Sequence, residues 1–252
     1  MDADLTFALE LADLADSMTL SGFRSEDLAV ETKDDNTPVT EVDRSVERAI
    51  RERVDRARPG EAVVGEEYGS EAGEVRWIVD PIDGTKNYVR GIPVFGTLIA
   101  LERDGELVVG VASAPALRRR WWAVRGEGAF ADEKPIRVSV IERLEDAQLC
   151  FGGLNAWRTA GRLKAFLSLA ARCKRTRGFG DFWMHMLVAE GSAEIAIEPE
   201  VSLWDLAAAK VIVEEAGGRF TDLDGRARAD GGSALSTNGL LHDVVLAGLG
   251  RP

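Results

Sequence analysis

The fold and the chemistry of this chain are both decided by the stretch Trp77-Ile78-Val79-Asp80-Pro81-Ile82-Asp83-Gly84-Thr85. Its first three residues form an apolar run that predicts a short buried strand, which delivers Asp80 at its end. Pro81 is expected to turn the chain, and a helical or nearly helical turn returns Asp83 to the side of Asp80. Gly84 lets backbone amides approach a ligand closely, and a helix beginning at Gly84-Thr85 offers N-terminal amides that favour phosphate. The stretch therefore predicts a cation site beside an anion site.

Acidic residues at three other positions fit the same pattern. Glu66 follows the apolar run of residues 63–65. Asp205 stands in the first turn of an apolar helix, and Asp43 completes a capping-box pattern with Thr40. Each has a structural explanation by itself: a solvated loop charge for Glu66, a favourable helix-dipole position for Asp205 and a helix cap for Asp43. Only their combination with the two aspartates above points to a shared site.

The charge of the whole chain limits what such a site can bind. The 252 residues include 43 acidic and 31 basic side chains, a formal net charge of −12, so the molecule repels polyanions such as nucleic acid. A small anionic substrate then requires a local source of positive charge, and a bound multivalent cation is the simplest one. We expect a small-molecule phosphate ester as partner and no nucleic acid.

Cysteine and histidine are too scarce to carry the chemistry. Cys150 and Cys173 are too isolated for a disulfide framework, which indicates a reducing compartment, by default the cytoplasm. His185 and His242 are the only histidines, too few for a His-rich metal site or for most Ser-His-Asp arrangements. No apolar run approaches the roughly 20 residues that cross a bilayer, so we expect no membrane association. Carboxylates are expected to do the chemistry.

Helical and strand-like periodicities alternate along the chain. No repeat or linker marks a domain boundary, so residues 1–252 are expected to form a single unit. A loop is expected at 33–38 and a hairpin at 103–106. Helical spacing covers 3–20, 40–57, 156–171, 181–190 and 203–216, and the strand-like ranges are 63–65, 77–79, 96–101, 107–111, 120–124, 136–140, 148–151, 194–197 and 219–221. This alternation favours an α/β (α+β layered) fold in which helices cover sheets.

Five short motifs follow one another in a fixed order. They are the segment from Asn36 to Asp43, Gly65-Glu66-Glu67, Asp80-Pro-Ile-Asp83-Gly-Thr85, Trp204-Asp205-Leu-Ala-Ala and Val213-Glu-Glu-Ala-Gly-Gly218. In this order and spacing, from about residue 30 to residue 225, the chain resembles the inositol monophosphatase family of metal-dependent small-molecule phosphatases. Ala209 stands where that family usually has glycine, which implies only a packing adjustment.

The resemblance implies a fold, a metal and an assembly. The fold is an αβαβα sandwich, and the assembly is a homodimer. Two or three Mg²⁺ ions are implied. The donor type agrees with this metal, since oxygen donors suit a hard dication whereas a zinc site would usually contain His or Cys. The implied ligands are Glu66, Asp80, the carbonyl of Ile82, Asp83 and Asp205.

The motif chemistry suggests how such a site hydrolyses a phosphate ester. We expect a metal-activated water near Glu66 to attack phosphorus directly, oriented by Thr85, whose hydroxyl is held by Asp43. The amides of Gly84 and Thr85 are expected to hold the phosphate. A second metal among the three aspartates of the ligand set would stabilise the departing oxygen, and no phosphoenzyme is required.

Other residues are expected to read the leaving group. The segments 177–183 and 198–205 are more similar to the histidinol-phosphate phosphatases of this family than to its inositol enzymes, which implies a place in histidine biosynthesis. Asp181 and Glu198 would hold an ammonium or a protonated ring, and Trp157, Phe182 or Trp183 would stack on an imidazole. The expected substrate contacts are Gly84, Thr85, Arg177, Asp181, Glu198 and Asp205.

Plainer explanations stay open for several of these residues. Asp181 is also explained as a helix N-cap, Phe182 and Trp183 as core aromatics, and Arg177 as part of a solvated basic stretch. His185, on an apolar helix, is expected to be a packing residue.

Other functions also stay open. One alternative is hydrolysis of inositol 1-phosphate. A second is hydrolysis of a bisphosphate, whose second phosphate would bind Arg118-Arg119-Arg120 or residues 174–177. A third is an inactive binding protein of the same fold. The unbroken acidic set argues against the last.

Overall fold

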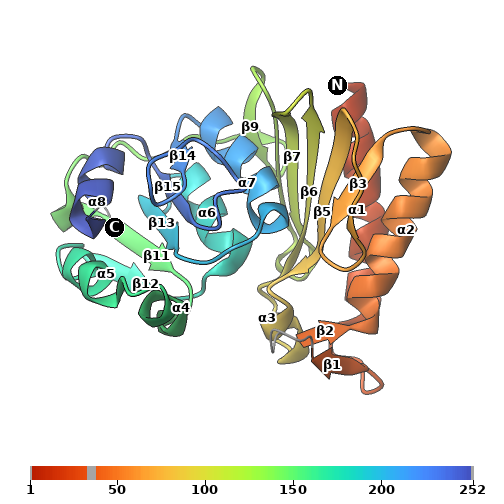
Figure 1. Ribbon diagram of the computed structural model, residues 1–252, viewed down its shortest axis with the longest axis horizontal. Coiled ribbons are helices and arrows are strands. Elements are labelled where there is room, and N and C mark those ends of the chain that lie inside the picture. The colour runs from red at the N-terminus through yellow and green to blue at the C-terminus, as the bar shows by residue number, and fades with distance from the viewer. Residues whose placement is uncertain (1, 33–37, 251–252) are drawn as a thin grey trace.

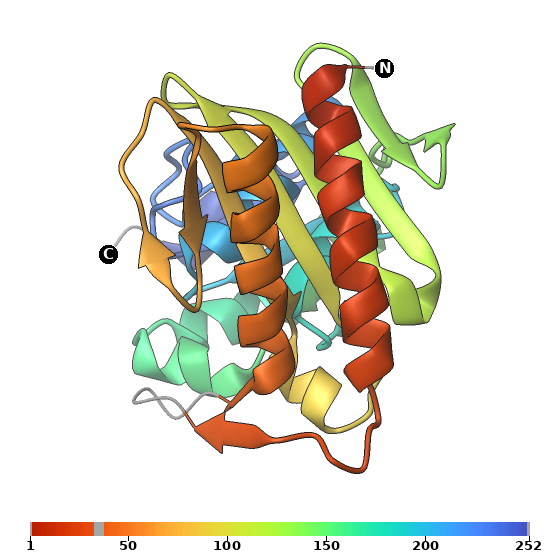
Figure 2. The ribbon, with the colours of Figure 1, turned by 90° about the vertical axis from the view of Figure 1, so that its right-hand side faces the viewer.

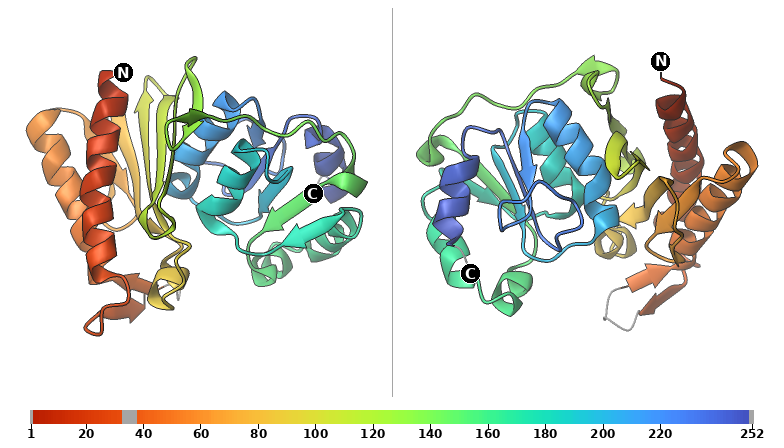
Figure 3. Two further views of the ribbon diagram at one scale, coloured as in Figure 1. Left: turned by 180° about the vertical axis from the view of Figure 1, so that it is seen from behind. Right: turned by 45° about the horizontal axis from the view of Figure 1, so that its top comes forward.

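The elements of the computed structural model, which describes residues 2–32 and 38–250, form five layers (Figure 1). The first layer is α1 (Ala3–Gly22) with α2 (Glu41–Ala57), and the third is α6 (Asp181–Ala189) with α7 (Leu203–Glu215). The fifth is α4 (Leu154–Thr159), α5 (Leu163–Ala170) and α8 (His242–Leu249), and two sheets fill the second and fourth layers. The views in Figure 3 show α1 with α2 on one outer side and α5 with α8 on the other. The expected αβαβα sandwich is confirmed.

The first sheet has eight strands in the order β10-β9-β8-β7-β6-β5-β3-β4. Only β3 and β5 run parallel, and every other neighbouring pair is antiparallel. The strands are β3 (Ala62–Gly65), β4 (Gly69–Ser70), β5 (Val75–Asp83), β6 (Gly96–Arg103), β7 (Glu106–Ala114), β8 (Arg119–Val124), β9 (Gly128–Ala131) and β10 (Lys134–Pro135).

The second sheet has five strands in the order β12-β11-β13-β15-β14. Strand β11 is parallel to both β12 and β13, so these three strands end at the same edge. They are β11 (Gln148–Phe151), β12 (Arg175–Arg177), β13 (Ile195–Glu198), β14 (Arg219–Thr221) and β15 (Ala234–Thr237). Outside both sheets lie the pair β1 (Val30–Thr32) and β2 (Pro38–Thr40), helix α3 (Thr85–Val89), and 3₁₀ turns at Pro115–Leu117 and Leu144–Asp146.

The central strands of the first sheet are apolar on both faces because helices cover both faces. Along β5, Trp77 and Val79 pack in the cluster formed with α1 and α2, whereas Ile78 packs in the cluster formed with α7. Successive residues of a strand point to opposite sides, so a strand buried on both sides has an unbroken apolar sequence. Figure 2 shows α1 and α2 lying side by side across the outer face.

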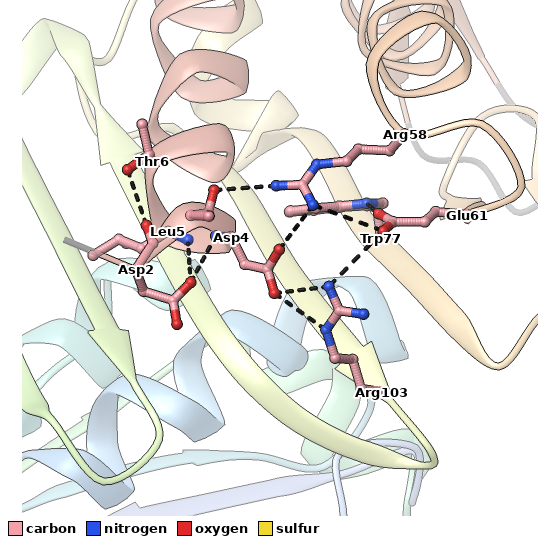
Figure 4. Close-up of polar contacts among 9 residues, drawn as sticks. Asp2, Asp4, Leu5, Thr6, Arg58, Glu61, Trp77 and Arg103 are labelled. Atoms are coloured by element: carbon pink, nitrogen blue, oxygen red, sulfur yellow. Dashed lines mark hydrogen bonds and ion pairs between the residues drawn. The ribbon is translucent and has the colours of Figure 1, made fainter.

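A group of ion pairs holds the first layer to the sheet at the end where β6 finishes (Figure 4). Asp4 of α1 pairs with Arg103 at 2.7 Å and with Arg58, which follows α2, at 3.1 Å. The indole N–H of Trp77 donates to Glu61 at 2.6 Å. These contacts fix α1 and α2 against the sheet. The position of α2 in turn places Asp43, in its first turn, at the opposite end of the sheet.

Two expectations about elements are wrong. Residues 136–140 form no strand: Val138 donates its N–H to the carbonyl of Ala216, and the side chain of Val140 is 85% exposed. Residues 156–171 form two helices, α4 and α5, because the chain turns at 160–162. In the predicted loop, residues 33–37 lie outside the described residues and Pro38 begins β2.

Within the described ranges, no helix has the length and apolar character needed to cross a membrane.

Candidate active site

Asp80 and Asp83 reach the same place by a bulge and not by the predicted turn. Strand β5 continues through Pro81 to Asp83, and its pairing with β6 shifts register between Asp80, opposite Leu98, and Asp83, opposite Gly96. Three steps on β5 therefore match two on β6. In a regular strand, residues three apart face opposite sides, and one extra residue restores them to the same side. The expected helical turn at Pro81 is wrong, although its consequence for the two carboxylates holds.

Asp205 completes a cluster with these two aspartates. It lies in the first turn of α7, where its carboxylate accepts the N–H of Ser202 at 2.8 Å in a capping box. One carboxylate oxygen from each of Asp80, Asp83 and Asp205 lies within 4.8 Å of the others. The residues come from a strand end and from a helix start about 120 positions later, so only the tertiary fold brings them together.

The cluster is electrostatically unfavourable without a cation. Burial raises the pKa of Asp80 well above its usual value, and the charges of Glu66, Asp83 and Asp205 add to this. Burial likewise raises the pKa of Asp83. Burial, opposed by the Ser202 N–H and reinforced by Glu66, raises the pKa of Asp205 to about 7. Among the residues that the structure describes, no arginine or lysine pairs with the three aspartates. Buried carboxylates in such a group suit a divalent ion.

Glu66, Asp43 and Thr85 lie around this cluster. Glu66 is close enough for its charge to raise the pKa of Asp80, Asp205 and Asp43, although burial is the larger cause for each. The hydroxyl of Thr85 donates to the carbonyl of Ile82 at 2.9 Å, and an oxygen of Asp43 lies 3.4 Å from it. The other oxygen of Asp43 accepts both the N–H (2.8 Å) and the hydroxyl (2.5 Å) of Thr40, in the predicted capping box.

Gly84 connects the cluster to the short helix α3. It is the N-cap residue with φ of 83°, in the left-handed region that glycine adopts without strain. A Cβ at this position would lie 3.0 Å from the carbonyl of Val94 and 3.4 Å from an oxygen of Asp181. The first amides of a helix have no acceptor within it, so the N–H groups of Gly84 and Thr85 suit an anion.

Asp181 and Glu198 face the site from the second half of the chain. Asp181 is not the N-cap of α6, because Gly180 holds that position; its carboxylate accepts the side-chain N–H of Asn87 at 3.1 Å. Burial, with the charges of Glu198 and Asp205, raises the pKa of Asp181 to about 7. Glu198 ends β13, at the edge where β11 and β12 also end. Open-sheet proteins commonly bind ligands at such carboxyl edges.

Two sets of predicted contacts turn out differently. Trp157 is fully buried and stacks on Phe166, and Phe182 is 1% exposed against Trp121, so neither can stack on a ligand. Arg177 is exposed on the outermost strand β12, and its guanidinium donates to the carbonyl of Thr176. The structure does not bring Arg177 to the carboxylate cluster.

His185, Arg119 and Arg120 already have hydrogen-bond or ion-pair partners within the chain. His185 is buried, with Nδ1 2.7 Å from the hydroxyl of Ser236 and Nε2 3.4 Å from Glu198. Arg119 pairs with Asp132 and Glu190, and Arg120 pairs with Asp13 and Asp16, which disfavours a second phosphate there.

Sequence reasoning missed two residues beside the site. Asn87 joins Asp181 to the carbonyl of Val94, to which it donates at 2.9 Å. Glu47 is fully buried beneath the turn that carries Glu66. A glutamate four positions after Asp43, on the same face of an amphipathic helix, was the available signal for Glu47.

Comparison with known proteins then identifies the family. The family model described as "Inositol monophosphatase family" matches residues 1–249. The chain belongs to the inositol monophosphatase family. Members of this family are metal-dependent phosphatases that act on small phosphate esters, so this chain is a phosphatase.

Individual relatives agree with this assignment over nearly the whole chain. The chain is 53% identical to the histidinol-phosphatase of Mycobacterium tuberculosis and 50% identical to that of Streptomyces coelicolor. Both alignments cover 98% of this chain and 97% of the relative. The extragenic suppressor protein suhB from Bartonella henselae has a similar structure, with a TM-score of 0.93 and 30% identity over 99% of both chains.

Proposed function

We propose that this phosphatase hydrolyses L-histidinol phosphate to L-histidinol and inorganic phosphate, as a step of histidine biosynthesis. The observation that carries the proposal is the convergence of Asp80, Asp83 and Asp205 within 4.8 Å next to a second acidic pair, Asp181 and Glu198. The first group suits metal ions and the second suits a cationic leaving group. The two histidinol-phosphatase relatives, each at least 50% identical, support this choice of substrate.

The residues that would hold Mg²⁺ are Glu66, Asp80, the carbonyl of Ile82, Asp83 and Asp205. The donor set fits the ion, because all donors are oxygens and one carboxylate oxygen from each of Asp80, Asp83 and Asp205 lies within 4.8 Å of the others. Two or three bound ions would supply the positive charge that lowers the pKa of water and balances charge on the ester oxygens. Bound dications would also reverse the repulsion that a chain of net charge −12 has for an anionic substrate.

The protein's own groups would orient the reactants. The amides of Gly84 and Thr85 would hold the phosphate, since they stand at the start of α3, where N–H groups have no acceptor within the helix. Thr85 would orient the attacking water through its hydroxyl, which Ile82 and Asp43 hold in place. Glu66 would accept a proton from that water. Direct attack on phosphorus needs no covalent enzyme intermediate.

Asp181 and Glu198 would select the leaving group. Histidinol carries an ammonium and an imidazole, and a cation between these carboxylates would relieve the repulsion that helps raise the pKa of Asp181 to about 7. Inositol carries no charge and would leave that repulsion in place. Because Trp157 and Phe182 are buried, the half-buried Trp183 is the remaining candidate for stacking on the imidazole. Arg177 would contact the substrate by turning its exposed guanidinium, which donates to the Thr176 carbonyl, toward the site.

A kinetic comparison tests the proposal. Initial rates would be measured on L-histidinol phosphate, inositol 1-phosphate and fructose 1,6-bisphosphate, each with Mg²⁺ and with EDTA. We expect kcat/KM for histidinol phosphate to exceed the others by at least about tenfold, with no phosphate released in EDTA. A preference for inositol 1-phosphate would refute the substrate, a preference for the bisphosphate would favour that alternative, and no hydrolysis of any ester would favour an inactive binding protein.

A matched pair of variants separates the leaving-group contacts from the rest of the site. Glu198→Gln and Asp181→Asn should raise KM for histidinol phosphate by about tenfold or more, because each removes one charge facing the ammonium. The same changes should alter KM for inositol 1-phosphate much less. Equal effects on both esters would contradict the assigned role.

The proposal also includes an assembly and a setting. We infer one functional unit over residues 1–252, acting as a homodimer in the cytoplasm. Family resemblance supports the dimer, and free Cys150 and Cys173 are compatible with a reducing compartment. Light scattering after gel filtration would test the dimer directly.

A further inference from the structure

Glu47 of α2 holds the turn that carries Glu66. Its side chain is 0% exposed, and its carboxylate accepts the backbone N–H of Glu67 at 2.7 Å and of Tyr68 at 3.2 Å. These two N–H groups belong to the three-residue connection, Glu66 to Tyr68, between β3 and β4. A buried carboxylate that accepts two amides of one turn fixes the position of that turn.

Arg51 also binds the backbone on both sides of this turn. Its guanidinium pairs with Glu47 at 2.8 Å and donates to the carbonyls of Val63 (3.2 Å) and Gly69 (2.7 Å), which lie before and after the turn. Arg51 also pairs with Glu71 at 2.7 Å. Together Glu47 and Arg51 bind the backbone of the hairpin at four points. Strand β4 has only two residues at the edge of its sheet, so the strand itself restrains the turn weakly.

Gly65 shows how closely the turn and Glu47 fit. A Cβ at Gly65 would lie 2.1 Å from one carboxylate oxygen of Glu47 and 2.6 Å from the other. No side chain larger than hydrogen fits there unless Glu47 moves, and Gly65 immediately precedes Glu66. The backbone of β3 therefore lies directly against the carboxylate, a contact that only glycine permits.

Helix α2 presents its site residues at a regular interval. Asp43, Glu47 and Arg51 are four positions apart, so they lie along one face of the helix. Asp43 contacts Thr85, and Glu47 holds the turn that carries Glu66. One face of α2 therefore contacts both the start of α3 and the turn after β3. Figure 2 shows α2 crossing the outer face of the sheet beside β3. Among the described residues, Glu47 and Arg51 bond to the hairpin and not to the three aspartates.

We propose that Glu47, supported by Arg51, is a positioning residue that sets the metal affinity of this site by fixing Glu66. The inference rests on the proposed function, in which Glu66 is a metal ligand. Residues that orient a metal ligand typically change metal affinity by about 10- to 100-fold when they are removed. A purely structural role would change stability and leave metal affinity unaltered.

The test is Mn²⁺ binding, measured on the full chain without substrate by electron paramagnetic resonance. Glu47→Gln keeps the shape of the side chain, but its amide offers one acceptor oxygen, so one of the two turn N–H groups loses its partner. We expect the Kd for Mn²⁺ to rise by about tenfold. In steady-state assays the Mg²⁺ concentration for half-maximal rate should rise equally, while kcat at saturating Mg²⁺ stays within about threefold of the wild type.

Two controls separate positioning from general effects. Glu52→Gln makes the same change at an exposed position of the same helix and should leave the Kd unchanged. Val54→Ala removes buried apolar volume from α2 and should lower the unfolding temperature without changing the Kd. Arg51→Lys, which keeps the charge but cannot bond both carbonyls and Glu47 together, should raise the Kd by a smaller factor.

The outcomes are distinguishable. A folded Glu47→Gln protein with wild-type Kd for Mn²⁺ overturns the inference and leaves the proposed function standing. If Glu47→Gln fails to fold, the Kd of Arg51→Lys decides: a raised value supports the inference, and an unchanged value overturns it. A wild-type chain that neither binds Mn²⁺ nor releases phosphate overturns the proposed function and this inference with it.

Discussion

Replacing Asp205 by asparagine should stabilise the metal-free protein while impairing the enzyme. Burial and nearby carboxylates raise the pKa of Asp205 to about 7, from an ordinary value of 3.8. A raised pKa means that the folded protein binds a proton more tightly than the unfolded chain does. Stability from this residue is therefore complete below about pH 4 and is lost as the pH rises through 7.

The size of the effect follows from this shift. At about 1.4 kcal/mol per pKa unit, an ionised Asp205 destabilises the fold by at most about 4 kcal/mol above pH 7. Neighbouring carboxyls that titrate with it share this energy, so we expect about 2 kcal/mol from Asp205→Asn, or about 4–8 °C in unfolding temperature. Asparagine can still accept the Ser202 N–H, so the cap of α7 is kept.

Thermal unfolding in EDTA at pH 8 and at pH 5.5 measures this effect. The unfolding temperature of Asp205→Asn should exceed that of the wild type by about 4–8 °C at pH 8. At pH 5.5 the difference should be about half as large, because the carboxyl is then protonated in the folded protein but still ionised in the unfolded chain. Added Mg²⁺ should stabilise the wild type far more than the variant. Asp104→Asn, in the exposed β6–β7 turn, removes the same charge and should show no such pattern. Equal stability of Asp205→Asn and wild type at pH 8 in EDTA would refute the reasoning.

Three further predictions concern single residues. Asp80→Asn should lower phosphate release by about 100-fold or more at saturating Mg²⁺, since it removes a ligand charge at the centre of the cluster; full activity would disprove its role. Thr85→Val keeps the volume but loses the hydroxyl between Ile82 and Asp43, so kcat should fall by about 100-fold with little change in KM, as measured by initial rates. Burial lowers the pKa of His242 to about 4, so NMR should show a neutral imidazole at pH 5. The protein should lose stability as the pH falls from about 6.5 to 4, because the unfolded chain then binds a proton that the folded protein does not. Titration of the folded imidazole near pH 6.5 would contradict this.

The sequence predicted most helices and strands because their pattern is local, whereas the order of the five layers was implied by the family resemblance, and β15 and α8 were not predicted. Strands buried on both faces, such as β5, have continuous apolar sequence, and the helices α1, α2 and α7 show apolar spacing or a capping residue. The errors arose where tertiary contacts override local preference. Residues 136–140 alternate like a strand, yet they cross the surface with Val140 exposed and find backbone partners in different elements.

The acidic residues of the site were predictable, but their geometry was not. Asp80 and Asp83 share a side only because β5 is bulged against β6, and no local signal separates a bulge from a turn at Pro81. Glu47 appears as an ordinary helix charge, because its burial depends on a hairpin about 20 residues later. Trp157 appears as a candidate stacking residue until its position beneath α5 is known.

The two sheets divide the work of the site between them. The parallel strands β3 and β5 end next to Glu66 and at Asp83, and the parallel strands β11 and β13 end near Glu198. The N-termini of α6 and α7 lie between the sheets and contribute Asp181 and Asp205, where the positive ends of the helix dipoles partly offset the repulsion among the carboxylates. Under the proposed function, metal ligands would come mainly from the first sheet, and leaving-group contacts would come from the second sheet and from α6. On this proposal, separate elements would hold the two groups, so residues that read the leaving group could change without disturbing the metal ligands, as expected for a fold that serves different phosphate esters.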